Sequence, residues 1–387
     1  MKKNKYEIDM CNGTIMDKLI SFSLPLMVSG ILQLMFNAVD IIVVGRFSGS
    51  QALAAVGSTT ALINVFINLF MGISLGANVL AARYYAAGRD REMSETVHTS
   101  IMLALISGVV MAFVGVFFAK GALELMDTPA DVIDQSALYM RIYFMGMPFF
   151  MLYNYGAAIL RAVGDTKRPL YFLIVASLVN IVLDVVFIAV FHWGVAGAAL
   201  ATVLAQLVST IGCFIYAFVR YPVLRLHRED WRITMMDVKR HLTRGIPLGL
   251  QFSVLAIGII VMQGGVVQFD MRDGVMVSNA AQNGFGAANR LFNLVATPMN
   301  ALGGAMTSFT AQNLGAGQYD RIRRGTLQAL DSSSMQRVIE WLSQATLAGQ
   351  RQARLQALRA RLFTEELLPL RSQRERTRLW TTFRTHY

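Results

Sequence analysis

The chain contains eight long apolar segments, and this feature most limits what it can fold into. The segments lie near residues 19–44, 53–80, 96–118, 136–160, 169–191, 194–219, 246–268 and 284–310. An α-helix needs about 20 apolar residues to cross the hydrocarbon core of a bilayer. Unpaired backbone groups are too costly in lipid for such segments to cross as anything but helices or closed barrels. Because only 15% of residues are charged, against about 25% in soluble domains, we predict an all-α integral membrane protein.

Basic residues gather in alternate gaps between these segments. They precede the first segment and follow the second, fourth, sixth and eighth, whereas the other gaps hold few Lys or Arg. The positive-inside rule assigns Lys- and Arg-rich gaps to the cytoplasm. We therefore expect a multi-pass protein of the plasma or inner membrane, in contact with the lipid bilayer, with both termini cytoplasmic. Residues 1–18 have no signal-peptide cleavage site, so we expect a retained polar lead-in.

The seventh and eighth segments repeat features of the first and second. Leu24-Pro25-Leu26 near the start of the first segment matches Ile246-Pro247-Leu248 in the seventh, and the second and eighth end in similar Ala- and Gly-containing turns. Both copies start on the same side, which is typical of transporters built from parallel repeats. We expect a six-helix lobe over 19–220, a cytoplasmic linker over 221–245 and a partial second lobe of two helices over 246–325.

The character of the chain changes after the eighth segment. Residues 326–387 contain ten Arg, no Lys and five acidic residues, and no apolar segment. Within this cytoplasmic tail, 335–363 could form a basic amphipathic helix on the anionic inner leaflet. The alternative, which we favour, is that the tail is not native to the fold, as in a shifted reading frame or a joined fragment.

Four polar residues within the apolar segments lie at similar depth, in the half of the membrane away from the N-terminus. They are Asp40, Asn180, Asp184 and Thr202. A carboxylate inside a bilayer is costly, on the order of 2–3 kcal/mol even on the mildest scale, and usually functional. Two carboxylates with an amide and a hydroxyl suit Na⁺, and two desolvated carboxylates equally suit a shared proton. We predict a cation-coupling site here; the alternative is local hydrogen bonding that serves packing.

Other polar residues could line a substrate cavity. They are Gln33, Asn37, Tyr139, Asn154 and Gln206. For each alone, an interhelical hydrogen bond is at least as good an explanation. The Gly164–Pro169 turn is expected to be structural, with Asp165 capping the following helix.

Several classes of function are disfavoured. No phosphate-binding G-x-x-x-x-G-K-[ST] motif occurs, so the chain does not itself power transport by ATP hydrolysis. The five His lack metal-ligand spacing and have no nucleophile near them, so we expect no enzyme and no cofactor beyond a coupling ion. Cys11 and Cys213 lie far apart and imply neither a disulfide framework nor a metal site. No nucleic-acid partner is expected.

Six stretches of the sequence resemble the multidrug and toxic compound extrusion (MATE) family of cation-coupled efflux transporters. They are Asp40-Ile41-Ile42-Val43-Val44-Gly45-Arg46, Ala52-Leu53-Ala54-Ala55, Leu160-Arg161-Ala162-Val163-Gly164-Asp165-Thr166, Asn180-Ile181-Val182-Leu183-Asp184, Gly194-Val195-Ala196-Gly197-Ala198-Ala199-Leu200-Ala201-Thr202 and Asn313-Leu314-Gly315-Ala316-Gly317. The resemblance implies twelve helices in two six-helix lobes. It also implies exchange of a drug-like, often cationic, compound for H⁺ or Na⁺ by alternating access.

The same resemblance implies that Asp40, Asn180, Asp184 and Thr202 form the cation site. Some members couple through an acid on the seventh helix, but Leu255 occupies that position here. The family has four more helices than this chain, so we expect the chain alone not to transport. Two alternatives stay open: a flippase for lipid-linked oligosaccharides, which the near absence of intramembrane Arg and Lys disfavours, and a non-transporting membrane protein with a regulatory tail.

Overall fold

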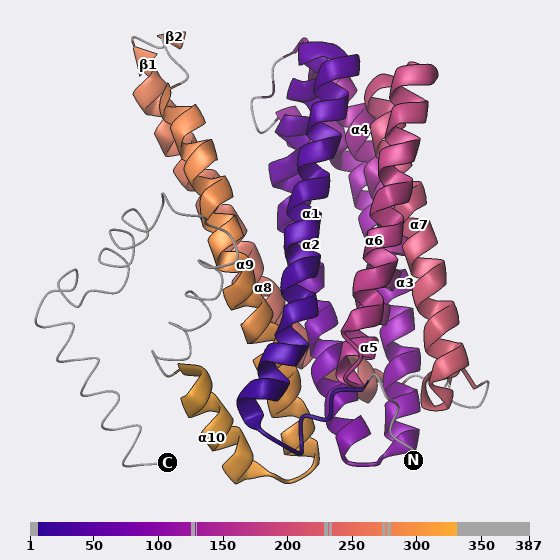
Figure 1. Ribbon diagram of the computed structural model, residues 1–387. Helices are drawn as coiled ribbons and strands as arrows, with labels where there is room; N and C mark the ends of the chain where they lie inside the picture. Colours follow the sequence, from indigo (N-terminus) through magenta and orange to yellow (C-terminus); the bar gives the residue numbers. More distant parts are fainter. Residues whose placement is uncertain are drawn as a thin grey trace, which may run out of the picture. The chain divides into compact units, whose positions relative to one another are not determined.

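The computed structural model is almost entirely helical (Figure 1). It describes residues 7–124, 128, 130–227, 231, 234–272, 275–276 and 280–330. The α-helices are α1 (Ile15–Phe47), α2 (Gly49–Ala86), α3 (Asp90–Glu124), α4 (Ile133–Met145), α5 (Met147–Ala162), α6 (Lys167–Asp184), α7 (Gly194–Arg220), α8 (Met235–Val267), α9 (Ala280–Gly315) and α10 (Tyr319–Leu330). The shorter elements are the π-helix η1 (Val185–Val190), the 3₁₀ turns η2 (Pro222–Leu224) and η4 (Gln268–Asp270), and the strands β1 (Met271–Arg272) and β2 (Val275–Met276). The strands pair antiparallel in a two-residue ladder. The prediction of an all-α fold is confirmed.

The helices follow the eight predicted segments, with three differences in their bounds. α1 begins at Ile15, so the expected lead-in is shorter than predicted. The fourth segment is broken between α4 and α5, because Pro148 follows Gly146 closely and can donate no backbone hydrogen bond. α8 begins at Met235, inside the expected linker, where Thr234 and Asp237 form a capping box.

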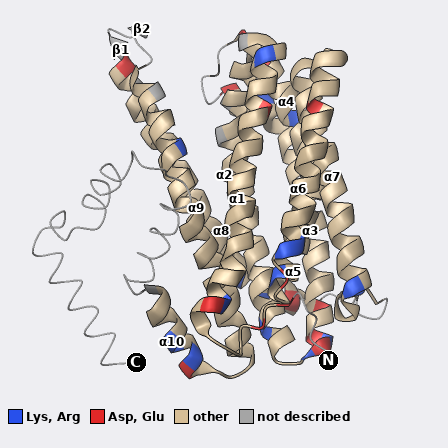
Figure 2. Cartoon of the chain, viewed as in Figure 1, with Lys and Arg blue, Asp and Glu red and all other residues tan. Residues whose placement is uncertain are grey.

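Six helical spans of the described chain are long and apolar enough to cross a membrane, two fewer than the segments predicted. They are Ile15–Phe47, Gln51–Ala86, Asp90–Glu124, Lys167–Val190, Gly194–Arg220 and Met235–Asp270. The fourth segment is too short in each half after its break, and α9 carries several Asn, Gln and Gly residues. Charged residues gather toward the ends of the helices (Figure 2). The chain is therefore a multi-pass membrane protein.

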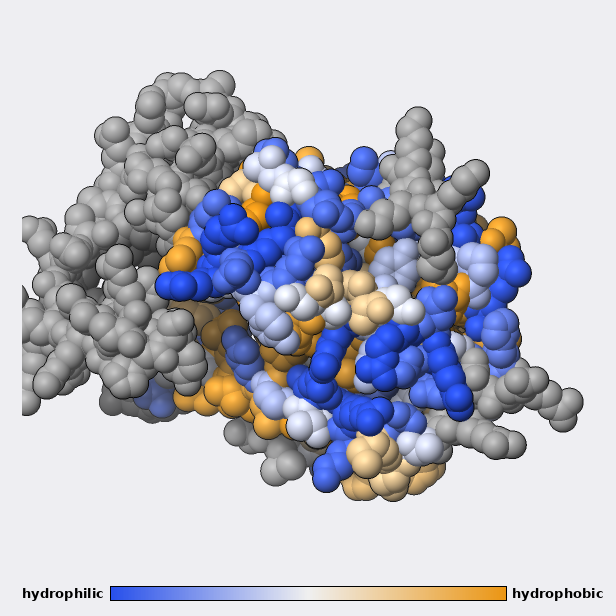
Figure 3. Space-filling view, turned by 90° about the horizontal axis from the view of Figure 1, so that it is seen from below, coloured by the Kyte–Doolittle hydropathy of each residue, from blue (hydrophilic) through white to orange (hydrophobic). Residues whose placement is uncertain are grey.

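Three helices end in the same glycine turn. α2, α5 and α9 are followed by Gly88, Gly164 and Gly317, with φ of 66°, 91° and 71°. In each case the next residue donates its N–H to a carbonyl five residues back, at 2.8 to 3.0 Å, the hydrogen bond that closes a Schellman motif. We call the end of the helices that carries these turns the turn end, and the opposite end, near β1 and β2, the ladder end. The turn end is largely hydrophilic on its surface (Figure 3).

α2 packs against α8 through glycines on both helices. Gly72 and Gly76 face Gly245 and Gly249, and a Cβ on Gly76 would lie 2.6 Å from the Gly245 nitrogen. Small residues four apart let two helix backbones approach closely, which is the usual way for membrane helices to associate. This contact lies toward the turn end and joins the first six predicted segments to the seventh.

Candidate functional site

Two carboxyl groups meet between α1 and α6. Asp40 lies on α1, two turns before the helix ends at Phe47, and Asp184 is the last residue of α6. The two side chains are close enough to interact directly. Asp184 is fully buried. The sequence-based pairing of these two residues is therefore reproduced in the structure.

The carboxyl pair lacks hydrogen-bond donors. Asp40 Oδ1 and both oxygens of Asp184 are buried and receive no N–H or O–H from the residues that the structure describes. A buried carboxylate without a partner is strongly unfavourable, and two in contact also repel each other. A proton held between them, or a hard cation bound by their oxygens, would remove both costs. The arrangement can therefore bind H⁺ or Na⁺.

Asn180 lies one helical turn before Asp184, on the same face of α6. Its side chain is buried, and its Nδ2 has no acceptor within the described part of the chain. Such a group costs about 1–3 kcal/mol when it is left unsatisfied. An amide that can turn toward a bound ion or a carboxylate would recover that energy, so Asn180 fits the predicted group.

Thr202, the fourth predicted residue, forms a local hydrogen bond, and its place in the cation site stays a prediction. Its hydroxyl donates to the Ala198 carbonyl of its own helix, α7, at 3.0 Å, the local bonding that the packing alternative predicted. The hydroxyl oxygen can still accept a hydrogen bond or bind a cation. One turn further along α7, Gln206 has a buried Nε2 without an acceptor among the described residues. Gln206 is thus a polar group with unused capacity on the same helix.

Tyrosines of α4 lie beside the carboxyl pair. Tyr139 is near both Asp40 and Asp184, and Tyr143 is near Asp40. Their rings stack with centroids 6.1 Å apart. Of the two, Tyr139 was predicted and Tyr143 was not, although the spacing of four residues places both on one helical face.

The structure places the other residues named from the sequence on α1, α5 and α8. Gln33 and Asn37 are exposed on α1, on the same stripe as Asp40. Asn154 donates to the Phe150 carbonyl of α5 at 2.8 Å, which is local bonding. Leu255 on α8 is 59% exposed.

The chain changes its helical geometry immediately after Asp184. Residues Val185–Val190 form the π-helix η1, which ends before His192, the one described non-glycine residue with positive φ. π-Helical turns are rare and occur often at functional sites. The wider turn follows directly on the carboxylate that the site depends on.

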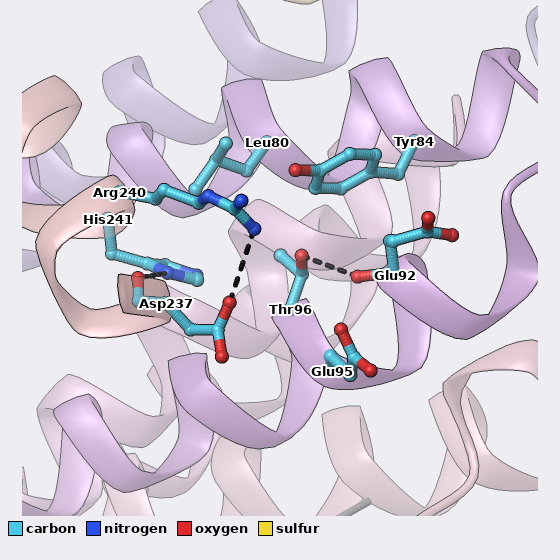
Figure 4. Close-up of a pocket in the computed structure, with 8 residues that line it drawn as sticks. All are labelled: Leu80, Tyr84, Glu92, Glu95, Thr96, Asp237, Arg240 and His241. Atoms are coloured by element: carbon cyan, nitrogen blue, oxygen red, sulfur yellow. Dashed lines mark hydrogen bonds and ion pairs between the residues drawn. The ribbon is translucent and has the colours of Figure 1, made fainter. Parts of the chain in front are cut away.

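A small pocket at the turn end is a different feature (Figure 4). Its lining comes from α2, α3 and α8: Leu80, Tyr84, Glu92, Glu95, Thr96, Asp237, Arg240 and His241. Within it, Arg240 pairs with Asp237 at 3.4 Å. With a cavity volume of about 10 Å³ it has room for about one water molecule, so it cannot be a site for a drug-sized ligand.

Comparisons with known proteins all point to one family. A family model described as MatE matches residues 25–186. The chain is 34% identical over 307 residues to the probable multidrug resistance protein YoeA of Bacillus subtilis, covering 78% of this chain and 65% of that protein. It is 29% identical over 320 residues to the probable multidrug resistance protein YpnP of the same organism, covering 81% of this chain and 68% of that protein.

Solved structures agree with these relatives. A MATE protein in the bent conformation matches with a TM-score of 0.76 at 25% identity, over 85% of this chain and 71% of that one. An outward-facing multidrug resistance transporter of the MATE family, within the MOP superfamily, matches with the same values. The chain spans about two thirds of the length of its curated relatives, 65% of the first. In sequence, in fold and in its paired carboxyls, the chain resembles the MATE family of membrane transporters.

Proposed function

We propose that this chain carries the cation-coupling half of a multidrug efflux antiporter, which exchanges drug-like, often cationic compounds for H⁺ or Na⁺ by alternating access. The observation that carries the proposal is the contact between Asp40 and Asp184, with three buried oxygens that receive no hydrogen bond from the described residues. Binding a cation changes the charge of this pair. A transporter needs such a change to link ion movement to its conformation.

Asp40, Asn180, Asp184 and Thr202 are the proposed cation-binding residues. The names of the Bacillus relatives support multidrug transport. The basic residues at the turn end support a cytoplasmic location for that end and for the N-terminus. A flippase for lipid-linked oligosaccharides would need basic residues deep within the spans. The described spans carry their Lys and Arg near their ends (Figure 2), which disfavours this alternative.

Cation binding can be tested on the purified 387-residue chain, without transport. A ligand that binds only the folded state raises its stability in proportion to the logarithm of its concentration. We expect the thermal unfolding midpoint in detergent to rise with NaCl, relative to choline chloride, or on acidification. Asp40→Asn and Asp184→Asn should each abolish that response.

Asp131→Asn is the matched control, because Asp131 is an exposed aspartate in the turn before α4. It should keep the full response to the cation. An undiminished response in both Asp40→Asn and Asp184→Asn would refute the proposed site. A response to acid but not to Na⁺ would identify the coupling ion as H⁺.

A further inference from the structure

The segment Glu7–Met10 is packed into the protein at the turn end, although its polar sequence predicts an unpacked lead-in. It crosses the turn end of the helices before α1 begins (Figure 1). Met10 is completely buried. Its side chain belongs to an apolar cluster with Phe22 of α1 and Phe309 of α9. A segment held in this way has a structural or regulatory role.

One side of this segment is bound to the first lobe, residues 19–220. The Ile8 N–H donates to the Gly164 carbonyl at 3.1 Å, and the Tyr85 hydroxyl donates to Glu7 Oε2 at 3.0 Å. A Cβ on Gly164 would lie 2.6 Å from the Ile8 oxygen. Gly164 is thus required both by its positive φ and by the close approach of the segment.

The turn that receives Ile8 is itself firmly held. Asp165 is completely buried, and its Oδ2 accepts hydrogen bonds from the hydroxyls of Tyr216 at 2.9 Å and Tyr221 at 3.1 Å. Its Oδ1 accepts the Arg168 N–H at 3.2 Å, which confirms the predicted cap of α6. Burial, and then the charge of Asp165, raise the pKa of Tyr221, so this hydroxyl stays a donor. The segment therefore has a rigid anchor on this side.

The other side of the segment is bound to α9 and α10. Gln312 Oε1 accepts the Met10 N–H at 3.2 Å. The Met10 carbonyl accepts two hydrogen bonds, from Asn313 Nδ2 and from Arg321 Nε, each at 3.1 Å. All the backbone hydrogen-bonding capacity of one residue is thus used by the elements that follow α8.

Polar side chains of α9 also form hydrogen bonds directly with residues of the first lobe. Gln312 Nε2 donates to the Ala162 carbonyl at 2.9 Å. One turn earlier, the Ser308 hydroxyl donates to Asn78 Oδ1 at 3.1 Å, and Asn78 Nδ2 donates to the Ala158 carbonyl at 2.7 Å. Buried polar groups that satisfy one another across helices are costly to separate singly. Gln312 thus serves both contacts, to the segment and to α5.

We propose that Glu7–Met10 is a latch that holds the first lobe and the α9–α10 elements together at the turn end, and that releases from α9 when this end opens. The proposal rests on the alternating access proposed above, since opening of the turn end would have to separate Ala162 from Gln312. Release costs the three hydrogen bonds at Met10 and the exposure of its side chain. The latch therefore favours the state in which the turn end is closed.

Release of the latch can be measured by the accessibility of residue 10. Met10→Cys in a Cys11→Ser, Cys213→Ala background places a single thiol at the buried position and keeps the backbone hydrogen bonds of residue 10. Gln312→Leu together with Asn313→Leu removes two of the three partners. We expect maleimide to alkylate Cys at position 10 about tenfold faster, since losing hydrogen bonds worth ~1.4 kcal/mol in sum changes an equilibrium tenfold.

Thr307→Ala is the control for alkylation, because the Thr307 hydroxyl bonds only within α9, to the Gly303 carbonyl at 2.9 Å. It should leave the rate unchanged. Equal rates in the double variant and the control would contradict the latch.

A second measurement asks whether release opens the turn end. Spin labels at Lys167→Cys and Tyr319→Cys, both exposed, report the distance between the start of α6 and the start of α10. The double variant should gain a longer-distance population that Thr307→Ala lacks. Faster alkylation with an unchanged distance distribution would overturn the proposal, because the segment would then be a static seal. Neither readout depends on cation binding or efflux, so loss of the proposed function would leave this test intact.

Discussion

At the scale of single residues, Asp165 shows how much one buried carboxylate can organise. It accepts hydrogen bonds from two tyrosine hydroxyls and one backbone N–H, so both of its oxygens have partners. Asp184 is equally buried, but neither of its oxygens receives a hydrogen bond from the described residues. The satisfied carboxylate of Asp165 is typical of a structural role, whereas the unsatisfied carboxylate of Asp184 is typical of a ligand-binding residue.

We expect Asp165→Ala to destabilise the protein by about 2 kcal/mol, because it leaves the buried Tyr221 hydroxyl and the half-buried Tyr216 hydroxyl without this acceptor. Tyr221→Phe removes one of the two hydroxyl donors and keeps the Asp165 carboxylate, so it should cost about 1 kcal/mol. Thermal unfolding in detergent measures both. Asp17→Asn, at an exposed position on α1, should have no effect. A midpoint for Asp165→Ala equal to that of the control would show that the turn does not depend on this carboxylate.

At the scale of elements, the contact between α2 and α8 depends on four glycines. Gly72, Gly76, Gly245 and Gly249 allow the two backbones to touch, and a side chain on any of them would collide with the opposite helix. Such a contact is specific in geometry because it has no flexible side chain to adjust.

Gly249→Ala should therefore lower stability by about 1–3 kcal/mol through overpacking against Leu69 of α2. Gly258→Ala lies on the same helix with no neighbouring atoms within 4 Å. It should be neutral, or stabilising by about 0.5–1 kcal/mol through helix propensity. Unfolding midpoints of the two variants in one detergent check the difference. A lower unfolding midpoint for Gly258→Ala than for Gly249→Ala would mean that α2 and α8 do not pack through these glycines.

At the scale of the whole molecule, α8 and α9 are well packed near the turn end and exposed toward the ladder end. Leu255 and Val261 on α8, and Leu291 on α9, are each more than half exposed. In the MATE relatives, about a third of the protein lies outside the region that this chain covers. We infer that transport needs that additional third to enclose a substrate opposite Asp40.

Accordingly, we expect the 387-residue chain to confer no drug resistance on cells that lack their own efflux pumps. A chimera in which residues after 325 are replaced by the corresponding region of the Bacillus YoeA protein should confer resistance. The chimera with Asp184→Asn serves as its inactive control. Growth in a series of cationic drug concentrations is the measurement. Resistance from the 387-residue chain itself would refute this expectation.

The helices could be predicted because apolar length is a local property of the sequence. The carboxyl pair could be predicted because Asp40 and Asp184 lie at similar depth in the membrane. Apolar length marked the spans, and matched depth brought Asp40 to Asp184. The break at Gly146 could also have been seen, since Pro148 lies within the fourth segment. The expected role of the tail falls mostly on residues 331–387, outside the described part of the chain.

The latch could not be predicted, because its hydrogen bonds join backbone atoms to side chains about 300 positions away. Met10 and Gln312 are 302 residues apart, and no periodic pattern links them. Thr202 was assigned to the site by depth, yet its hydroxyl bonds within its own helix. Depth specifies a layer of the membrane, while the rotation of each helix decides which side chains meet.

The hydrogen bond between the Met10 N–H and Gln312 also implies an order of events during synthesis. Ribosomes add about 5–20 residues per second, so the partner of Met10 emerges roughly 15 to 60 s after Met10 itself, given their separation of 302 residues. Throughout that interval the Met10 N–H and carbonyl lack their partners on α9 and α10. Once α9 and α10 have docked, these backbone groups are hydrogen-bonded and the Met10 side chain is buried. The burial of Met10 therefore reports that assembly is complete.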